Sequence, residues 1–222
     1  MQPITIALPN LSLSVCTRAR FAKTTRLMKI PQAVCVYAAS SSKVAPVYLQ
    51  AAHKLGTLLA QHRITLINGA GRTGLMAATT QGCLEQGGKA VGVIPTFMLE
   101  QNWQHASMSQ LIEVDNMHER KQRMAHLSEG IVALPGGCGT LEELLEIITW
   151  KQLGLYTHPV VILNTNGFYD PLIAMLQRAV DERFMSPLHA TIWQVASHPQ
   201  EAIDLLLNTP EWEPSVRKLA AL

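Results

Sequence analysis

The chain has 222 residues, of which 48% are hydrophobic and 15% are charged, and its formal net charge at pH 7 is +2. This length suits one well-packed α/β domain and is short for two. No apolar run approaches the roughly 20 residues that cross a membrane. A nucleic-acid arm is a weak interpretation of the basic residues near the start of the chain, so we expect no nucleic-acid partner.

The first 29 residues differ in composition from the rest of the chain. They lack acidic residues and carry five clustered cations, at Arg18, Arg20, Lys23, Arg26 and Lys29. Such a segment fits a transit peptide, a disordered tail, or an upstream extension if translation starts at Met28. Because nothing in it specifies import, we favour the last two. We therefore expect a basic extension at 1–29, a folded domain at 30–210 and a tail at 211–222.

From residue 31 onward, short apolar runs alternate with patterns of helical period. The expected strands are 33–39, 65–68, 90–94, 111–114, 131–134, 160–163 and 192–195. The expected helices between them are 46–62, 74–86, 117–129, 141–153, 170–184 and 200–207. This alternation predicts a single-domain Rossmann-like α/β fold, with a parallel sheet covered by helices on both faces. A ligand would bind at the carboxyl ends of the strands.

The segment from Gly130 to Glu146, GIVALPGGCGTLEELLE, joins a buried strand, a glycine turn and the start of a helix. Glycines in the turn permit positive φ and let a ligand approach the backbone. They are Gly136, Gly137 and Gly139. Thr140 is the expected N-cap of the helix, whose free N–H groups and positive dipole end would favour a phosphate.

The acidic residues of this segment have two interpretations. Thr140 and Glu143 fit the S/T-x-x-E capping box, in which the glutamate only bonds back to the cap residue. That interpretation leaves Glu142 unexplained. Two carboxylates beside an anion site oppose anion binding, so a catalytic role is one reason to keep them.

A second glycine turn, from Gly69 to Gly74, follows the strand at 65–68 and reads G-x-G-x-x-G. This pattern is typical of dinucleotide-binding folds. However, no carboxylate lies about 20 residues further on to hold a ribose hydroxyl, which disfavours NAD. A turn for the sugar or phosphate of a mononucleotide, with Gly69 and Gly71 at the ligand, remains open.

Residues 117–121, MHERK, begin the helix expected at 117–129. Arg120 offers bidentate recognition of a phosphate or another acceptor edge, although such a charged run is usually a solvated helix face. Ser40 follows the first strand and could donate a hydrogen bond to a ligand.

Cysteines and histidines give no metal signature. The four cysteines, Cys16, Cys35, Cys83 and Cys138, are scattered and form no C-x-x-C pair. Free thiols in a reducing cytoplasm are the simplest interpretation. None of the eight histidines forms an H-E-x-x-H pair, so we expect no metal and no cofactor.

Several motifs in one order resemble the LONELY GUY (LOG) family, the cytokinin riboside 5′-monophosphate phosphoribohydrolases that were historically labelled lysine decarboxylases. They are PGGCGTLEE at 135–143, MHERK at 117–121, GAGRTGLM at 69–76, GVIP at 92–95 and TWKQLG at 149–154. The resemblance spans about residues 33–185. No lysine lies in a recognisable PLP-binding context, so nothing supports decarboxylation.

This resemblance implies hydrolysis of the N-glycosidic bond of a nucleoside 5′-monophosphate, giving free base and ribose 5-phosphate. By motif position, it assigns catalysis to Arg120 and Glu143. It assigns substrate binding to Gly136, Gly137, Gly139, Thr140, Glu142, Lys121, Gly69, Gly71 and Ser40. It also implies a homodimer. A non-catalytic nucleotide-binding module using the same turn is the alternative.

Overall fold

The computed structural model describes residues 30–212, which form one seven-stranded sheet with the strand order β4-β3-β2-β1-β5-β6-β7. Every pair of neighbouring strands is parallel. The strands are β1 (Ala33–Tyr37), β2 (Thr65–Asn68), β3 (Ala90–Pro95), β4 (Gln110–Val114), β5 (Ile131–Ala133), β6 (Val160–Leu163) and β7 (Trp193–Ala196). The predicted Rossmann-like α/β fold is confirmed.

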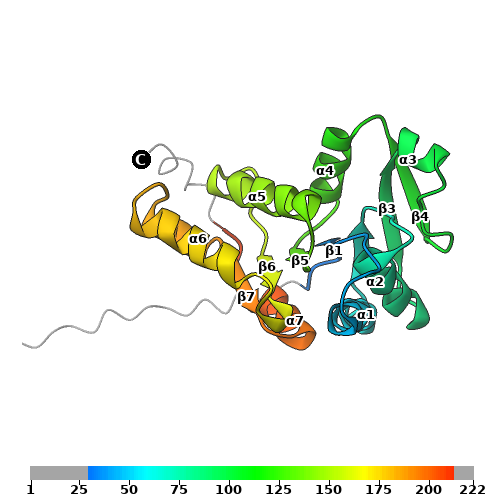
Figure 1. Cartoon of the computed structure of the whole chain (residues 1–222), viewed down its shortest axis with the longest axis horizontal. Coiled ribbons are helices and arrows are strands. Elements are labelled where there is room, and N and C mark those ends of the chain that lie inside the picture. Colours follow the sequence, from blue (N-terminus) through cyan, green and yellow to red (C-terminus); the bar gives the residue numbers. More distant parts are fainter. Residues whose placement is uncertain (1–29, 213–222) are drawn as a thin grey trace, which may run out of the picture.

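Helices cover both faces of this sheet (Figure 1). The helices are α1 (Pro46–Gln61), α2 (Gly74–Glu85), α3 (Thr96–Glu100), α4 (Met117–His126), α5 (Cys138–Gln152), α6 (Asp170–Asp181) and α7 (Pro199–Asn208), with two short 3-10 turns at Thr165–Gly167 and Pro187–Thr191. None of these helices is both long and apolar enough to cross a membrane.

Alternate residues of the strands supply two hydrophobic cores, because successive side chains of a strand point to opposite faces. Val34 and Val36 of β1 pack with α1, α2 and α7. Cys35 and Tyr37 pack with α4, α5 and α6 on the other face. Parallel strands buried on both faces read as continuous apolar runs, which is why the sequence showed them.

The sheet also determines where a ligand can bind. From β1 the chain moves outward through β2, β3 and β4, and then returns to place β5 on the other side of β1. The connections that leave β1 and β5 therefore diverge, and they open a crevice at the carboxyl ends of these strands. The loops after β1, β2 and β5 all reach this crevice, as does the start of α4.

Candidate active site

A cavity of about 650 Å³ occupies this crevice, which is within the usual size range of small-molecule sites. All the site residues expected from the sequence line it except Gly136. Those that line it are Arg120, Glu143, Gly137, Gly139, Thr140, Glu142, Lys121, Gly69, Gly71 and Ser40. The fold thus brings three separate sequence motifs to one cavity.

The amino end of α5 is open toward the cavity. Gly137 is the N-cap residue, no side chain caps the helix, and its first turn holds no acidic residue. Within the described part of the chain, the N–H groups of Cys138, Gly139 and Thr140 have no hydrogen-bond acceptor. Free N–H groups at the positive end of a helix dipole form an anion site.

Two other helices that begin at the cavity, α2 and α4, have acceptors at their first turns. At α2, the N–H groups of Leu75 and Met76 donate to the carbonyl oxygen of Ala39, at 2.9 and 3.2 Å. At α4, the side-chain oxygen of Asn116 accepts from two backbone N–H groups. Because these first-turn N–H groups already have acceptors, α2 and α4 offer a phosphate fewer free donors than α5 does.

The start of α5 corrects two expectations. Thr140 is not the N-cap, because the helix begins two residues earlier and places Thr140 at its third position. The capping box with Glu143 is therefore wrong, since Glu143 lies one turn further inside the helix. The glycines also do not use positive φ. A Cβ on Gly136 would come 2.2 Å from Oγ1 of Thr140, so Gly136 is needed for space.

The second glycine turn holds Arg120 in place. The Arg120 side chain is buried, and its Nε and Nη2 atoms donate to the carbonyl oxygens of Val93 (3.2 Å) and Gly69 (3.1 Å). A Cβ on Gly69 would lie 1.5 Å from Nη2 of Arg120. Gly69 is therefore a glycine because the guanidinium lies against it. Arg120 forms no ion pair among residues 30–212, so its positive charge stays available to the cavity.

Positive φ in this turn falls on Ala70 and on Gly74, not on Gly69 or Gly71. The buried Asn68 supports the conformation at Ala70, because its Oδ1 accepts from the Ala70 N–H at 2.9 Å while its Nδ2 donates to Oγ1 of Thr80. The turn is thus rigid and internally bonded. Both Gly69 and Gly71 still line the cavity.

Glu143 is a carboxyl in an unfavourable place for a charge. Burial raises its pKa to about 7, and this effect exceeds the opposite effect of Arg120 and Lys121. No other described residue forms a hydrogen bond with its carboxyl group. A carboxyl that titrates near neutral pH beside a cavity is suited to general acid or base chemistry.

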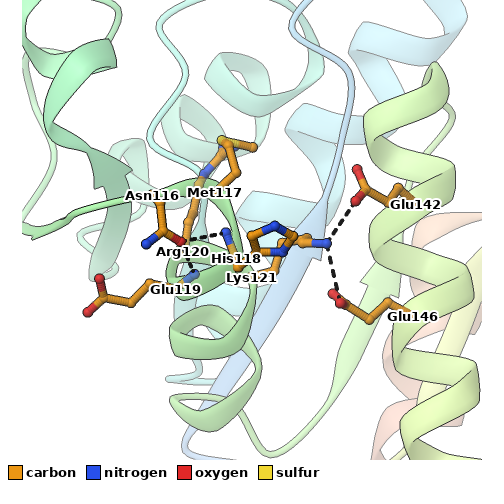
Figure 2. Close-up of polar contacts among 8 residues, drawn as sticks. All are labelled: Asn116, Met117, His118, Glu119, Arg120, Lys121, Glu142 and Glu146. Atoms are coloured by element: carbon orange, nitrogen blue, oxygen red, sulfur yellow. Dashed lines mark hydrogen bonds and ion pairs between the residues drawn. The ribbon is translucent and has the colours of Figure 1, made fainter.

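Lys121 joins α4 to α5, as Figure 2 shows. Its Nζ donates to Oε1 of Glu142 at 2.8 Å and to Oε1 of Glu146 at 3.3 Å. The Lys121 side chain is 7% exposed, whereas that of Glu142 is 62% exposed. The hydrogen bond from Lys121 lowers the pKa of Glu142. Glu142 and Glu143 are adjacent in the sequence, yet their pKa values are shifted in opposite directions.

Sequence reasoning missed the apolar wall of the cavity. Met76, Met98, Trp103 and Met117 line it beside Ile94, and Trp103 is 48% exposed. Methionine side chains adapt to irregular apolar ligands. Neither Met98 nor Trp103 lies in a recognisable motif, so only their position next to the GVIP segment could have indicated a role. Arg72, at the rim, was also missed.

Metal ligands were not expected from the sequence, and residues 30–212 contain no group of three or more His, Cys, Asp and Glu that could hold an ion. Cys35, Cys83 and Cys138 are free thiols, of which only Cys138 is exposed. Cys16 lies outside the described residues.

Comparison with known proteins places the chain in a family. A family model described as "Possible lysine decarboxylase" matches residues 76–206. Cytokinin riboside 5′-monophosphate phosphoribohydrolase LOG7 of Arabidopsis thaliana is 39% identical over 188 residues, which cover 85% of each chain. LOG5 of the same plant is 40% identical over 173 residues, which cover 78% of this chain and 76% of LOG5. The chain belongs to the LOG family.

Solved structures with the same fold extend beyond the phosphoribohydrolases. The molybdenum cofactor carrier protein of Chlamydomonas reinhardtii superposes with a TM-score of 0.62 at 23% identity, over 86% of this LOG chain and 98% of that chain. The molybdenum cofactor binding protein of Rippkaea orientalis gives a TM-score of 0.59 at 22% identity, over 78% and 92%. At these identities the likeness shows the fold alone.

Proposed function

We propose that this LOG protein hydrolyses the N-glycosidic bond of cytokinin riboside 5′-monophosphates and releases the free base and ribose 5-phosphate. The observation that carries the proposal is the cavity that places Arg120 and Glu143 beside the open amino end of α5. The relatives named phosphoribohydrolases support the same activity.

The 5′-phosphate would bind at the amino end of α5. Its oxygens would accept hydrogen bonds from the free N–H groups near Gly137 and Gly139, and Thr140 could add its hydroxyl group. The first turns of α2 and α4 support this location, because backbone N–H groups there already have acceptors, whereas those of α5 do not. The phosphate then fixes the distance from the ribose to the carboxyls one turn further along the helix.

The proposed chemistry starts from the bond between C1′ of the ribose and the ring nitrogen of the base. As this bond breaks, its electron pair leaves with the base and positive charge builds on the ribose. Ionised Glu143 would stabilise that charge and accept a proton from the water whose oxygen bonds to C1′. The departing base would take up a proton from solvent to become the free base, and Glu143 would then return its own proton to solvent. Arg120 would stabilise the negative charge on the leaving base. Glu142, kept ionised by Lys121, would accept hydrogen bonds from the ribose hydroxyls.

The apolar wall supports a substrate with a hydrophobic group on the base. Met98, Trp103 and Met117 offer contacts that an isopentenyl chain would fill better than a bare amino group does. We therefore propose N6-prenylated adenosine monophosphate as the preferred substrate over AMP.

Incubation with AMP and with isopentenyladenosine monophosphate, followed by chromatography for free base, tests this proposal. The wild type should release base, whereas Arg120→Ala and Glu143→Gln should lose turnover. Arg123→Ala is the matched control, because Arg123 is an exposed arginine on the same helix outside the cavity. Nucleotide binding without base release from any monophosphate would instead support a non-catalytic binding module.

We also propose that the protein is a cytoplasmic homodimer. Exposed apolar side chains on the outer surface of α5 and the turn after it, Leu145, Leu153 and Leu155, give such a dimer an apolar surface to bury. The free thiols fit a reducing compartment. Elution at the monomer mass in size-exclusion chromatography would contradict the dimer, and a fluorescent fusion of the full chain would test the location.

A further inference from the structure

Glu146 lies one helical turn after Glu142 and shares Lys121 with it. Residues four apart on a helix lie on the same side, so α5 presents both carboxylates to α4. Lys121 extends between them, whereas Glu119 of α4 points away from α5 (Figure 2). Glu146 does not line the cavity, and it lies between the motifs at 135–143 and 149–154, in neither of them.

The Lys121 ammonium is well satisfied in this position. Burial opposes its charge, but the two carboxylates outweigh burial and raise the pKa of Lys121. An ammonium has three N–H donors, and two of them bind Glu142 and Glu146. The Lys121 side chain is only 7% exposed, so its ion pairs are screened less by solvent than pairs between two exposed side chains.

The neighbours of Lys121 in the chain and in space are the proposed catalytic groups. Arg120 precedes it on α4, and Glu143 follows Glu142 on α5. A shift between α4 and α5 would therefore change the distance between Arg120 and Glu143, and positioning errors of about 1 Å can cost about 100-fold in rate.

We propose that Lys121 and Glu146 are positioning residues, an inference that rests on the proposed function. They lock α4 to α5 so that Arg120 and Glu143 face the substrate together, and their opposite charges balance the electrostatic field at Glu143. In this arrangement Lys121 acts through the carboxylates, and Glu146 limits how strongly the ammonium favours the ionised form of Glu143.

The charges around Glu143 make this proposal testable, because removing a positive and a negative charge should shift the pKa of Glu143 in opposite directions. On α4, Arg120 and Lys121 favour its ionised form, and on α5 Glu142 and Glu146 oppose it. Three uncharged groups whose pKa values are raised also interact with it, namely Cys35 and Tyr37 of β1 and Tyr169 at the start of α6. Removing the Lys121 charge should raise the pKa of Glu143, and removing the Glu146 charge should lower it.

The experiment compares the wild type with Lys121→Met, Lys121→Arg and Glu146→Gln. It measures kcat against pH with isopentenyladenosine monophosphate and titrates the Glu143 carboxyl by ¹³C NMR, with its signal assigned by its loss in Glu143→Gln. We expect the midpoint to rise by about 0.5 to 1 pH unit in Lys121→Met, to fall by about as much in Glu146→Gln, and to stay near wild type in Lys121→Arg. Glu182→Gln, on the exposed Arg178–Glu182 pair of α6, is the control.

An active wild type whose midpoint moves in neither Lys121→Met nor Glu146→Gln, or moves in the same direction in both, overturns the inference and leaves the proposed function standing. If the wild type releases no base, the proposed function fails and the NMR midpoints alone decide the inference. Glu146 is part-exposed, so we expect Glu146→Gln to fold. Its Glu143 midpoint can therefore be measured and must fall even if Lys121→Met does not fold.

Discussion

Two consecutive glutamates show how position within one helical turn determines chemistry. Glu142 is exposed and bound by Lys121, which lowers its pKa. Glu143 lines the cavity, where burial raises its pKa to about 7. Environments that separate the pKa values of two carboxyls assign them to different tasks. Glu142 is therefore suited to a permanently charged hydrogen-bond acceptor, and Glu143 to proton transfer.

Glu143→Gln should make the protein more stable at alkaline pH. Folded Glu143 holds its proton up to about pH 7, whereas an ordinary glutamate releases it near 4.5. The folded state thus binds more protons between these values, and stability falls as pH rises through this window. We expect Glu143→Gln to gain about 2 kcal/mol at pH 8, which corresponds to roughly 5 °C, and almost nothing at pH 4.

Thermal unfolding at the two pH values measures this gain. Glu142→Gln is the matched control, because the lowered pKa of Glu142 means that its charge stabilises the fold at pH 8. The same gain in both variants, or a gain for Glu143→Gln that does not depend on pH, would contradict the assigned environment of Glu143.

For single residues, the sequence was enough to select the candidate site residues but not to predict the contacts that explain why each residue is needed. Arg120 and Glu143 could be selected from motifs, yet the need for glycine at 69 depends on a guanidinium 51 positions away in the chain. The pairing of Glu146 with Lys121 was missed for the same kind of reason. A spacing of four on the helix indicates a shared side, but the partner comes from another helix.

Helices of this fold differ in what their amino ends can bind. The ends of α2 and α4 are closed by the Ala39 carbonyl and the Asn116 side chain, while α5 is left open. The openness of α5 has a cost, because an uncapped helix end forgoes a contribution of about 1 kcal/mol. Glycine at 139, inside the first turn, adds to that cost.

Gly139→Ala should therefore stabilise the free protein and weaken phosphate binding. A Cβ at Gly139 meets nothing within 4 Å, so alanine should gain about 0.5 to 1 kcal/mol in the helix. Because a helical Cβ tilts toward the amino end, the new methyl would approach the proposed anion site. We expect about a 10-fold loss of affinity for ribose 5-phosphate, measured by calorimetry.

Gly82→Ala is a suitable contrast to that variant. Gly82 lies in the interior of α2, where a Cβ would come 2.0 Å from the carbonyl oxygen of His53. This change should destabilise the fold. If Gly139→Ala instead kept wild-type affinity for ribose 5-phosphate, the amino end of α5 would not be the phosphate site.

The observed bounds of the strands and helices show which elements could be predicted from the sequence. All seven strands were predicted to within two residues, because buried parallel strands are short apolar runs. The five-residue α3 was missed, since it buries no residue and is too short for a helical period. The start of α5 was predicted too late because Thr140 resembles a cap, whereas the true cap is a glycine whose role depends on tertiary packing.

The domain as a whole extends further than the sequence suggested. The expected boundary at residue 210 excludes Trp212, yet the Trp212 N–H donates to the Thr157 carbonyl at 2.7 Å and the partly buried Trp212 side chain packs against a hydrophobic core. The Lys151 ammonium lies 5.8 Å from the centre of that ring. Burial lowers the pKa of Lys151 to about 8, so Trp212 helps to cover a buried charge.

A chain ending at residue 210 should consequently be less stable than one ending at 212. Both would begin at residue 30, and the loss of a partly buried tryptophan with its hydrogen bond should cost about 1 to 2 kcal/mol. Trp212→Ala in the full chain should cause a similar loss, because it removes the ring without shortening the chain. Denaturant unfolding of the three proteins beside the full chain measures these differences. Equal midpoints for the 30–210 and 30–212 chains would contradict the assignment of Trp212 to the folded domain.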